Sequence, residues 1–281
     1  MSKTPLQNQI DELAETRNDT RIVRLQMVHE LAAANDRSIR EVELAALEMG
    51  VVPWRYLRNL GTIGLEGQAR LLQATAAVVG LGGLGGYVVE ALARMGVGRL
   101  ILIDGDVFEE HNFNRQLLSA EERLGVDKVQ AARQRVAAIN GAVEVTGHAV
   151  MLTRENLTHL LEEADMVVDA LDRLPTRLML QKGAQALGIP MVHGSIAGFL
   201  GQVMTIFPGD PGLRGLYGEA TDLPEQGLEA RLGTPAATPM AVAAWEAQEV
   251  VKILTGQGEL LRHRLLVMDM GSGAVEMLQL G

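Results

Sequence analysis

The sequence predicts an α/β protein: a Rossmann-like, mostly parallel sheet with flanking helices, a C-terminal antiparallel portion and an N-terminal helical extension. Two observations carry this prediction. From residue 51 onward, short apolar runs alternate with segments of helical periodicity, which is typical of repeated βαβ units. The first of these runs leads into the glycine-rich stretch GLGGLGG, with a helical segment behind it. We expect the extension to cover residues 1–50 and one larger domain to cover residues 51–281.

Residues 1–50 are rich in Glu, Arg, Ala and Leu, with apolar side chains at helical spacing. Ile22, Leu25, Val28 and Leu31 give that spacing, so two or three short helices are expected. No chemical group stands out in this extension. It is interpreted either as a packing or dimerisation element or as a docking element for a partner.

The larger domain divides into a parallel part and a closing part. Strands are expected at residues 76–79, 100–104, 143–146, 166–170 and 190–194, with helices at 83–95, 127–140, 156–163 and 175–187 between them. Residues 201–207 alternate like an antiparallel strand, residues 208–233 are rich in glycine and proline, and residues 238–254 are typical of a long apolar helix. Residues 265–270 and 274–280 predict a closing strand pair.

The composition favours a soluble, acidic protein. The net charge of −10 and the pI near 5.1 argue against a general nucleic-acid binder, because phosphate contacts require a basic face. Residues 1–24 are polar and charged rather than a signal peptide, so a cytoplasmic location is expected. Residues 71–89 are uncharged, but five of them are glycines. They are interpreted as a buried strand, loop and helix, so no membrane association is expected.

A glycine loop and a following carboxylate predict a nucleotide site. Gly80, Gly82, Gly83 and Gly85 lie between a predicted strand and a predicted helix. Glycine lets the backbone approach phosphates there, and the helix N-terminus faces the anion. Asp104 ends the second strand about 20 residues farther on, where a Rossmann unit places the carboxylate that binds ribose hydroxyls. This much suits NAD as well as ATP.

The residues behind Asp104 favour ATP, since an ordinary dinucleotide fold has no need of an Arg there. They include Asp106, Asn112, Asn114, Arg115 and Gln116. The run IDGDVFEEHNFNRQ, together with the glycine loop, closely resembles the MoeB/ThiF/HesA adenylating enzymes, relatives of the ubiquitin-activating enzyme. In that family the loop is followed by D-x-D and then N-x-x-R-Q. The resemblance covers residues 52–281.

The resemblance implies roles for residues that otherwise have structural interpretations. Lys128, in the sequence GVDK, matches the family's G-x-x-K and would neutralise triphosphate charge together with Arg115, although a lysine in a first helical turn is usually solvated. Asp172 matches the family's magnesium-binding aspartate, although such a residue also caps turns. Arg173 follows it where the family commonly has Asn. Asn112 matches an Asn near the phosphates, the alternative being turn chemistry, and Asn114 is left open.

Arg58 lies in WRYLRN, which is followed by EGQ and resembles the family's R-Y-x-R-Q and E-G-Q. In the family the second Arg reaches the ATP site of the opposite subunit, which implies a homodimer. Taken alone, an Arg-rich helix edge is a solvated face. The implied catalytic residues are Arg58, Arg115, Lys128 and Asp172, with Asp172 as the metal ligand. The implied nucleotide-binding residues are Gly80, Gly82, Gly83, Gly85, Asp104, Asp106, Asn112, Arg115 and Lys128.

The chain has no cysteine. Family members often hold zinc with two C-x-x-C pairs, but Gly212 and Gly215 stand where the first pair would lie and the chain stops about where the second would begin, so no zinc is expected. Some relatives carry the acyl group on a cysteine in the crossover region, here roughly residues 224–233. Thr221, Glu225, Gln226 and Glu229, in or beside that region, offer no thioester nucleophile, so the implied mechanism ends at the acyl-adenylate.

The resemblance therefore implies adenylation, with ATP and Mg²⁺, of the C-terminal glycine carboxylate of a small β-grasp sulfur-carrier protein. Such a carrier would end in Gly-Gly, resemble MoaD or ThiS, and serve molybdenum- or tungsten-cofactor or thiamine synthesis. Two alternatives stay open. An NAD-dependent oxidoreductase leaves Arg115, Lys128 and Asp172 unexplained. A catalytically silent binding subunit is the other alternative, and the retention of all the named polar residues argues against it.

Overall fold

The computed structural model of the chain describes residues 3–218, 227 and 229–280. An eight-stranded sheet forms its centre, in the order β11-β10-β9-β8-β7-β4-β5-β6. The parallel strands are β4 (Thr75–Val79), β5 (Arg99–Ile103), β6 (Glu144–His148), β7 (Met166–Asp169) and β8 (Met191–Ala197). The antiparallel strands are β9 (Leu200–Ile206), β10 (Arg264–Asp269) and β11 (Ala274–Gln279). The predicted fold class is confirmed.

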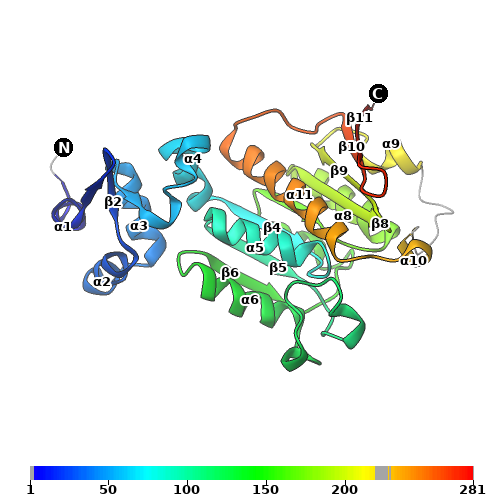
Figure 1. Cartoon of the computed structure of the whole chain (residues 1–281), viewed down its shortest axis with the longest axis horizontal. Helices are drawn as coiled ribbons and strands as arrows, with labels where there is room; N and C mark the ends of the chain where they lie inside the picture. Colours follow the sequence, from blue (N-terminus) through cyan, green and yellow to red (C-terminus); the bar gives the residue numbers. More distant parts are fainter. Residues whose placement is uncertain (1–2, 219–226, 228, 281) are drawn as a thin grey trace.

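Helices cover both faces of the sheet, and Figure 1 shows α5 and α11 lying across one of them. That face carries α4 (Leu60–Gln73), α5 (Gly85–Met95), α6 (Lys128–Ile139) and α11 (Ala237–Thr255). The other face carries α7 (Leu157–Leu161), α8 (Leu174–Leu187) and α9 (Leu213–Tyr217). Alternate residues of β4 enter the two cores, with Ala76 and Val78 on the α5 side and Ala77 and Val79 on the α8 side. The βαβ alternation expected from the sequence is therefore present.

The N-terminal extension contains the expected short helices and also a small sheet that was not predicted. Its helices are α1 (Pro5–Leu13), α2 (Leu25–Asn35) and α3 (Ile39–Glu48). Its strands are β1 (Glu15–Arg17), β2 (Thr20–Val23) and β3 (Val52–Pro53), and β3 lies beyond residue 50. Asn18 and Asp19 form the β1–β2 turn with φ of 44° and 62°. Ile22 was counted toward helical spacing, but it lies in β2. The prediction was wrong here because a strand this short shows no detectable period of its own.

A buried polar network joins the extension to the larger domain. Tyr56 Oη donates to Glu43 Oε2 of α3 at 2.9 Å, and Asn140 Nδ2, at the end of α6, donates to Tyr56 Oη at 2.8 Å. Arg55 Nε lies 3.3 Å from Glu43 Oε1. Burial raises the pKa of Glu43 to about 7, although Arg55 acts to lower it. Figure 1 shows the extension at one end of the molecule, next to α4 and away from β10 and β11.

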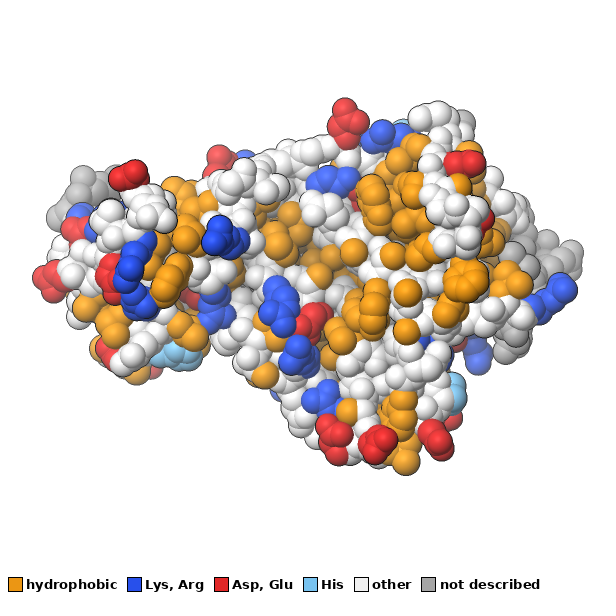
Figure 2. Space-filling view, in the orientation of Figure 1, with side chains coloured by type: hydrophobic (Ala, Val, Ile, Leu, Met, Phe, Trp, Pro, Cys, Tyr) orange, Lys and Arg blue, Asp and Glu red, His pale blue; other side chains and the backbone are white. Residues whose placement is uncertain are grey.

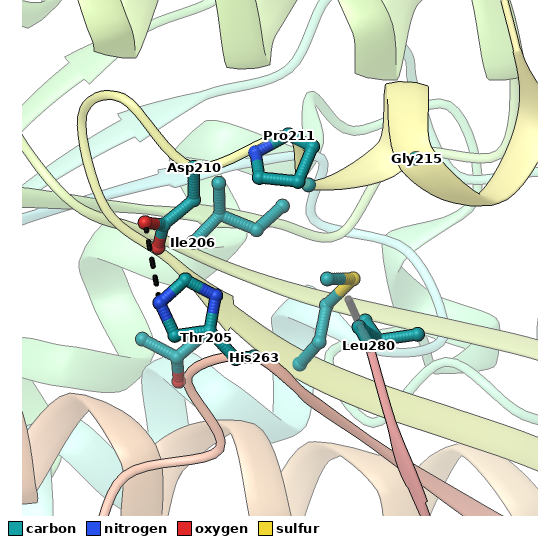
Figure 3. Close-up of a pocket in the computed structure, with 9 residues that line it drawn as sticks. Thr205, Ile206, Asp210, Pro211, Gly215, His263 and Leu280 are labelled. Atoms are coloured by element: carbon teal, nitrogen blue, oxygen red, sulfur yellow. Dashed lines mark ion pairs between the residues drawn. The ribbon is translucent and has the colours of Figure 1, made fainter.

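The glycine- and proline-rich segment contains α9 and the short helix α10 (Glu229–Leu232). Thr221, Glu225 and Gln226 of the crossover region, and the side chain of Glu229, lie outside the described residues. A cavity of about 80 Å³ lies beside this segment, lined in part by Gly212, Gly215 and Leu280. In Figure 3 the Asp210 carboxylate points toward the His263 ring, 3.7 Å away. Arg262 Nη2 donates to the same carboxylate at 2.8 Å, so an ion pair joins this segment to the β10 region.

Exposed apolar side chains gather around the C-terminal strands. Val275 and Met277 of β11 lie opposite Met268 and Leu266 of β10, whose side chains are buried. On this face α11 covers β9, where Val242 packs against Gly201, whereas all of the residues of β11 are exposed and Val275 is 62% exposed. Figure 2 shows hydrophobic side chains over this part of the surface. In the described part of the chain, no helix is long and apolar enough to cross a membrane.

Candidate functional site

The glycine loop joins β4 to α5, and two of its positions accept only glycine. Gly80 has φ of +90°, and a Cβ there would lie 2.5 Å from the Ala170 carbonyl oxygen. A Cβ on Gly85 would lie 1.8 Å from the Gly80 carbonyl oxygen, so the loop closes tightly on itself. Among the described residues, no side chain caps the first amides of α5, which can therefore face an anion. The predicted phosphate loop has the shape that such a cradle requires.

Asp104 follows β5 directly, and its carboxylate braces the loop. Oδ2 accepts a hydrogen bond from Leu81 N at 2.6 Å, and Oδ1 accepts one from Asp106 N at 2.8 Å. Burial raises the pKa of Asp104, while Lys128 and these two N–H groups act to lower it. Sequence reasoning missed this bracing role. Each carboxylate oxygen retains a further lone pair that can accept a hydrogen bond from a ribose hydroxyl. Ribose binding by Asp104 stays a prediction.

Lys128 begins α6, and its ammonium group lies against Asp106. Nζ donates to Asp106 Oδ2 at 2.9 Å, and Lys128 N donates to the Asp106 carbonyl oxygen at 3.1 Å. The Lys128 side chain is 7% exposed and that of Asp106 is 52% exposed. Because the Lys128 charge also acts on Asp104, which holds the glycine loop, a nearly buried positive charge lies close to that loop.

Arg115 and Asp172 come from different connections and influence each other electrostatically. Arg115 Cγ lies 3.7 Å from the position that a Cβ on Gly83 would take. Its Nη1 donates to the His111 carbonyl oxygen and to Asn114 Oδ1, both at 2.9 Å. Burial lowers the pKa of Arg115, whereas the nearby carboxylate of Asp172 acts to raise it. Two residues separated by 57 positions in the sequence therefore lie at the same edge of the sheet.

The polar residues around Arg115 have structural partners. Asn112 is 4% exposed, and its Oδ1 accepts a hydrogen bond from Glu109 N at 3.0 Å. This is the turn chemistry weighed as the alternative, and a phosphate contact of Asn112 stays a prediction. Asn114 Nδ2 donates to the Thr234 carbonyl oxygen at 3.2 Å, tying the loop to the segment before α11. Gln116 is 6% exposed and faces Gly82, and its Oε1 has no partner among the described residues.

Arg58 does not join the other predicted residues. Its segment is anchored at the C-terminal ends of α5 and α6, where Gln68 Nε2 donates to the Met95 carbonyl oxygen and Asn140 Nδ2 donates to Tyr56 Oη. The 11 residues of α5 put about 16 Å between that end and the glycine loop. Arg58 is exposed and, within the described residues, its side chain makes no hydrogen bond or ion pair. The geometry thus separates Arg58 from the nucleotide loop of its own chain.

The donor chemistry at this edge fits magnesium shared with a nucleotide. Asp172 is exposed, and its carboxylate makes no hydrogen bond or ion pair with another described residue. Mg²⁺ is usually held by one or two carboxylates plus substrate phosphates and water, which one free carboxylate satisfies. Over the described residues, no cluster of three or more His, Cys, Asp or Glu could hold a metal alone. At the family's zinc position, a Cβ on Gly212 would lie 2.7 Å from Gln181 Oε1, so no ligand side chain fits there without a shift.

Sequence reasoning missed a group of buried polar side chains behind Asp172. Asp169, Arg177, His193 and Glu246 are all less than 10% exposed and come from β7, α8, β8 and α11. The available signal was a polar residue closing each of two apolar strand segments, Asp169 after two valines and His193 after Met-Val. Only the parallel register, which pairs Asp169 with His193, makes these residues neighbours.

Comparisons with known proteins identify relatives of this chain in sequence and in fold. The ThiF family profile matches residues 56–281. The chain is 38% identical over 220 residues to the SAMP-activating enzyme E1 of Haloferax volcanii, covering 76% of this chain and 80% of that relative. It is 38% identical over 225 residues to the sulfur carrier protein adenylyltransferase of Thermus thermophilus, covering 76% and 82%. A crystal structure of E. coli MccB with ATP has a similar fold, with a TM-score of 0.71 and 23% identity over 81% of this chain and 72% of that one.

The match begins at the segment that carries Arg58 and spans the whole larger sheet with its glycine loop. It confirms the family inferred from the glycine loop and the N-x-x-R-Q run. The chain belongs to the ThiF family.

Proposed function

We propose that this chain uses ATP to adenylate the C-terminal carboxylate of a small ubiquitin-like sulfur-carrier protein. The observation that carries the proposal is the grouping of a glycine loop, the Lys128–Asp106 pair and Arg115 beside Asp172 at one edge of the sheet. The similarity to relatives named as a sulfur carrier protein adenylyltransferase and a SAMP-activating E1 supports the substrate class.

The reaction requires positioning and charge stabilisation rather than a base. A carrier carboxylate oxygen attacks the α-phosphorus, the bond between the α-phosphorus and its bridging oxygen breaks, and pyrophosphate leaves. The carboxylate is already ionised, so no proton is removed. Backbone amides of the glycine loop hold the phosphates, and Arg115 and Lys128 neutralise the charge that builds on them. Asp172 holds Mg²⁺, which screens the phosphate charge when bound.

The uncovered apolar face of β11 supports a protein substrate. Val275, Met277 and Phe199 are at least 40% exposed near the C-terminal strands, and exposed apolar surface is typical of protein contact sites. We propose that the carrier docks on this face and that its Gly-Gly tail extends toward Asp172. In a homodimer, Arg58 of one subunit then serves the site of the other, since it lies far from its own glycine loop.

An NAD-dependent oxidoreductase is not favoured, because it gives Arg115, Lys128 and Asp172 no task and the family relatives carry adenylyltransferase names. A silent binding subunit remains the alternative that an activity measurement decides.

The test is ATP–pyrophosphate exchange, measured with purified carrier proteins ending in Gly-Gly. Exchange that requires a carrier with an intact C-terminal glycine supports adenylation, and a carrier lacking that glycine is the control. ATP binding without exchange for any carrier would instead identify a silent subunit, and nicotinamide binding without ATP binding would identify an oxidoreductase.

A further inference from the structure

The turn that carries Asp172 is held by buried side chains on both sides of its backbone. Leu171 N donates to Asp169 Oδ1 at 3.2 Å, and the Leu171 carbonyl oxygen accepts a hydrogen bond from Arg177 Nη2. Ala170 N donates to the Val79 carbonyl oxygen at 3.0 Å, which continues the pairing of β7 with β4. Both peptide groups of the residue before Asp172 are therefore fixed by side chains that lie behind the site.

Asp169 is itself oriented by His193. The two residues are paired in register at the ends of β7 and β8, and both side chains have no exposed surface. Asp169 Oδ2 accepts a hydrogen bond from His193 Nδ1 at 2.7 Å, while Oδ1 remains for Leu171. His193 Nε2 lies 3.4 Å from Gln202 Nε2, which is a donor, so His193 Nε2 is the acceptor of a neutral imidazole. Burial lowers the pKa of His193, in agreement with that neutral form.

Arg177 balances the charge of this group. It enters from α8, is 8% exposed, and its Nη1 donates to the Gly194 carbonyl oxygen of β8 at 3.2 Å. Glu246 of α11 is fully buried, and neither of its carboxylate oxygens has a partner among the described residues. Burial raises the pKa of Glu246 well above its ordinary value, and the negative charge of Asp169 adds to this while Arg177 acts to lower it, so the neutral form of Glu246 is favoured. With Glu246 in that form, the charges of Asp169 and Arg177 balance each other, which suits a buried group.

We infer that Asp169, His193 and Arg177 form a positioning network that fixes the 170–172 turn and thereby aims the Asp172 carboxylate at the metal. Asp169 and His193 have no exposed surface and Arg177 is 8% exposed, so all three lie behind the site surface. They act through the backbone of Leu171, in the way that hydrogen-bond partners behind a metal ligand orient it. The inference rests on the proposed function, since it takes Asp172 as the magnesium ligand.

A matched pair of substitutions at His193 tests this network. Asn at position 193 can place an amide donor near the position of Nδ1, whereas Leu has a similar volume and no donor. Binding of ATP is measured by calorimetry with and without Mg²⁺. A second measurement gives the Mg²⁺ concentration at which ATP–pyrophosphate exchange is half-maximal. We expect His193→Leu and Arg177→Met to raise that concentration about 10-fold or more. Both should also weaken the Mg²⁺-dependent part of ATP binding, while ATP alone binds as in the unchanged chain. His193→Asn should keep the Mg²⁺ requirement close to that of the unchanged chain.

Two further variants separate positioning from loss of stability. Thr205 lies on the neighbouring strand β9, away from the 170–172 turn, and Thr205→Val removes its buried hydrogen bond to Glu249 of α11. It should lower the melting temperature without changing the Mg²⁺ requirement. Arg177→Lys keeps the charge and protects the fold if Arg177→Met is unstable. It should still raise the Mg²⁺ requirement, because one ammonium nitrogen replaces the two guanidinium nitrogens that donate separately to Leu171 and Gly194. An equal Mg²⁺ effect of Thr205→Val, or no difference between His193→Leu and His193→Asn, would overturn the inference.

The same measurements distinguish failure of the inference from failure of the proposed metal site. If Asp172→Asn leaves the Mg²⁺ dependence unchanged, the role of Asp172 is wrong and the network has no ligand to position. If Asp172→Asn removes Mg²⁺-dependent binding while His193→Leu and Arg177→Lys behave like the unchanged chain, only the positioning role is wrong.

Discussion

Lys128 and Asp106 form an ion pair at the glycine loop, with Nζ 2.9 Å from Oδ2 and the lysine side chain nearly buried. The lysine is the first residue of α6, and the aspartate lies in the connection after β5, so the pair joins two segments that frame the nucleotide loop. The proposed task of Lys128 is to stabilise charge on the transferring phosphate.

Lys128→Ala should lower ATP–pyrophosphate exchange by about 10²–10³-fold, the usual loss when one charge-stabilising donor is removed. Circular dichroism should show an intact fold. Lys182→Ala is the matched control, because Lys182 is an exposed lysine on α8. A Lys128→Ala protein with unchanged exchange would exclude the proposed role.

Gly85 and Gly82 should respond differently to alanine. A Cβ on Gly85 would overlap the Gly80 carbonyl oxygen at 1.8 Å, so Gly85→Ala should destabilise the fold by about 3 kcal/mol or more. The nearest atom to a Cβ on Gly82 is 3.5 Å away, so Gly82→Ala should melt like the unchanged chain and yet bind ATP more weakly, since its methyl group enters the phosphate loop. Thermal melts and calorimetric ATP titrations measure both effects. Equal melting temperatures for the two variants would show that the loop is less tightly closed than described.

Arg58→Ala and Asp172→Ala should complement each other if Arg58 acts across a dimer. Each variant alone should be inactive, and mixing them should restore up to about a quarter of the activity, because random pairing leaves one mixed dimer in two, with one intact site. The rescue is measured as ATP–pyrophosphate exchange after the two variants have been refolded together or have swapped subunits. Arg37→Ala is the control, since Arg37 is an exposed arginine whose ion pair is local, with Glu41. Absence of any rescue, with dimers present by light scattering, would exclude action in trans.

Glu43 should make stability fall as pH rises toward neutrality. Its pKa is raised to about 7 in the fold from an ordinary value of 4.5, so the folded chain holds a proton that the unfolded chain releases. Unfolding free energy is therefore lost as pH rises from 4.5 through 7, on the order of 1–3 kcal/mol. Glu43→Gln should remove this loss, so its stability relative to the unchanged chain should increase between pH 5 and 8.

Glu41 of the same helix is the control for that measurement. The pKa of Glu41 is lowered, chiefly by the backbone N–H of Ser38 and then by Arg37, so Glu41 is ionised in both states above pH 5. The stability difference caused by Glu41→Gln should therefore stay constant between pH 5 and 8. Denaturant melts at several pH values measure both variants, and a parallel pH profile for the two would contradict the assignment of a raised pKa to Glu43.

The sequence by itself determined the parallel sheet, the glycine loop, the closing antiparallel strands and the family. These features have local causes. Apolar runs alternate with helical periods, and the N-x-x-R-Q run is contiguous. Glycine is required by a positive φ at residue 80 and by a close backbone contact at residue 85. Short strands were less visible. The β1–β2 hairpin has three- and four-residue strands, too short to show a period of two, and its Asn18-Asp19 turn was the one local signal.

Only the tertiary structure decided which distant residues meet. The register of β7 against β8 brings Asp169 to His193, and the order of the sheet brings Asp172 toward Arg115. The same packing places Arg58 at the far end of α5, away from the residues with which the sequence grouped it. Strand order and register depend on how whole elements pack, and a residue's neighbours along the chain do not contain that information.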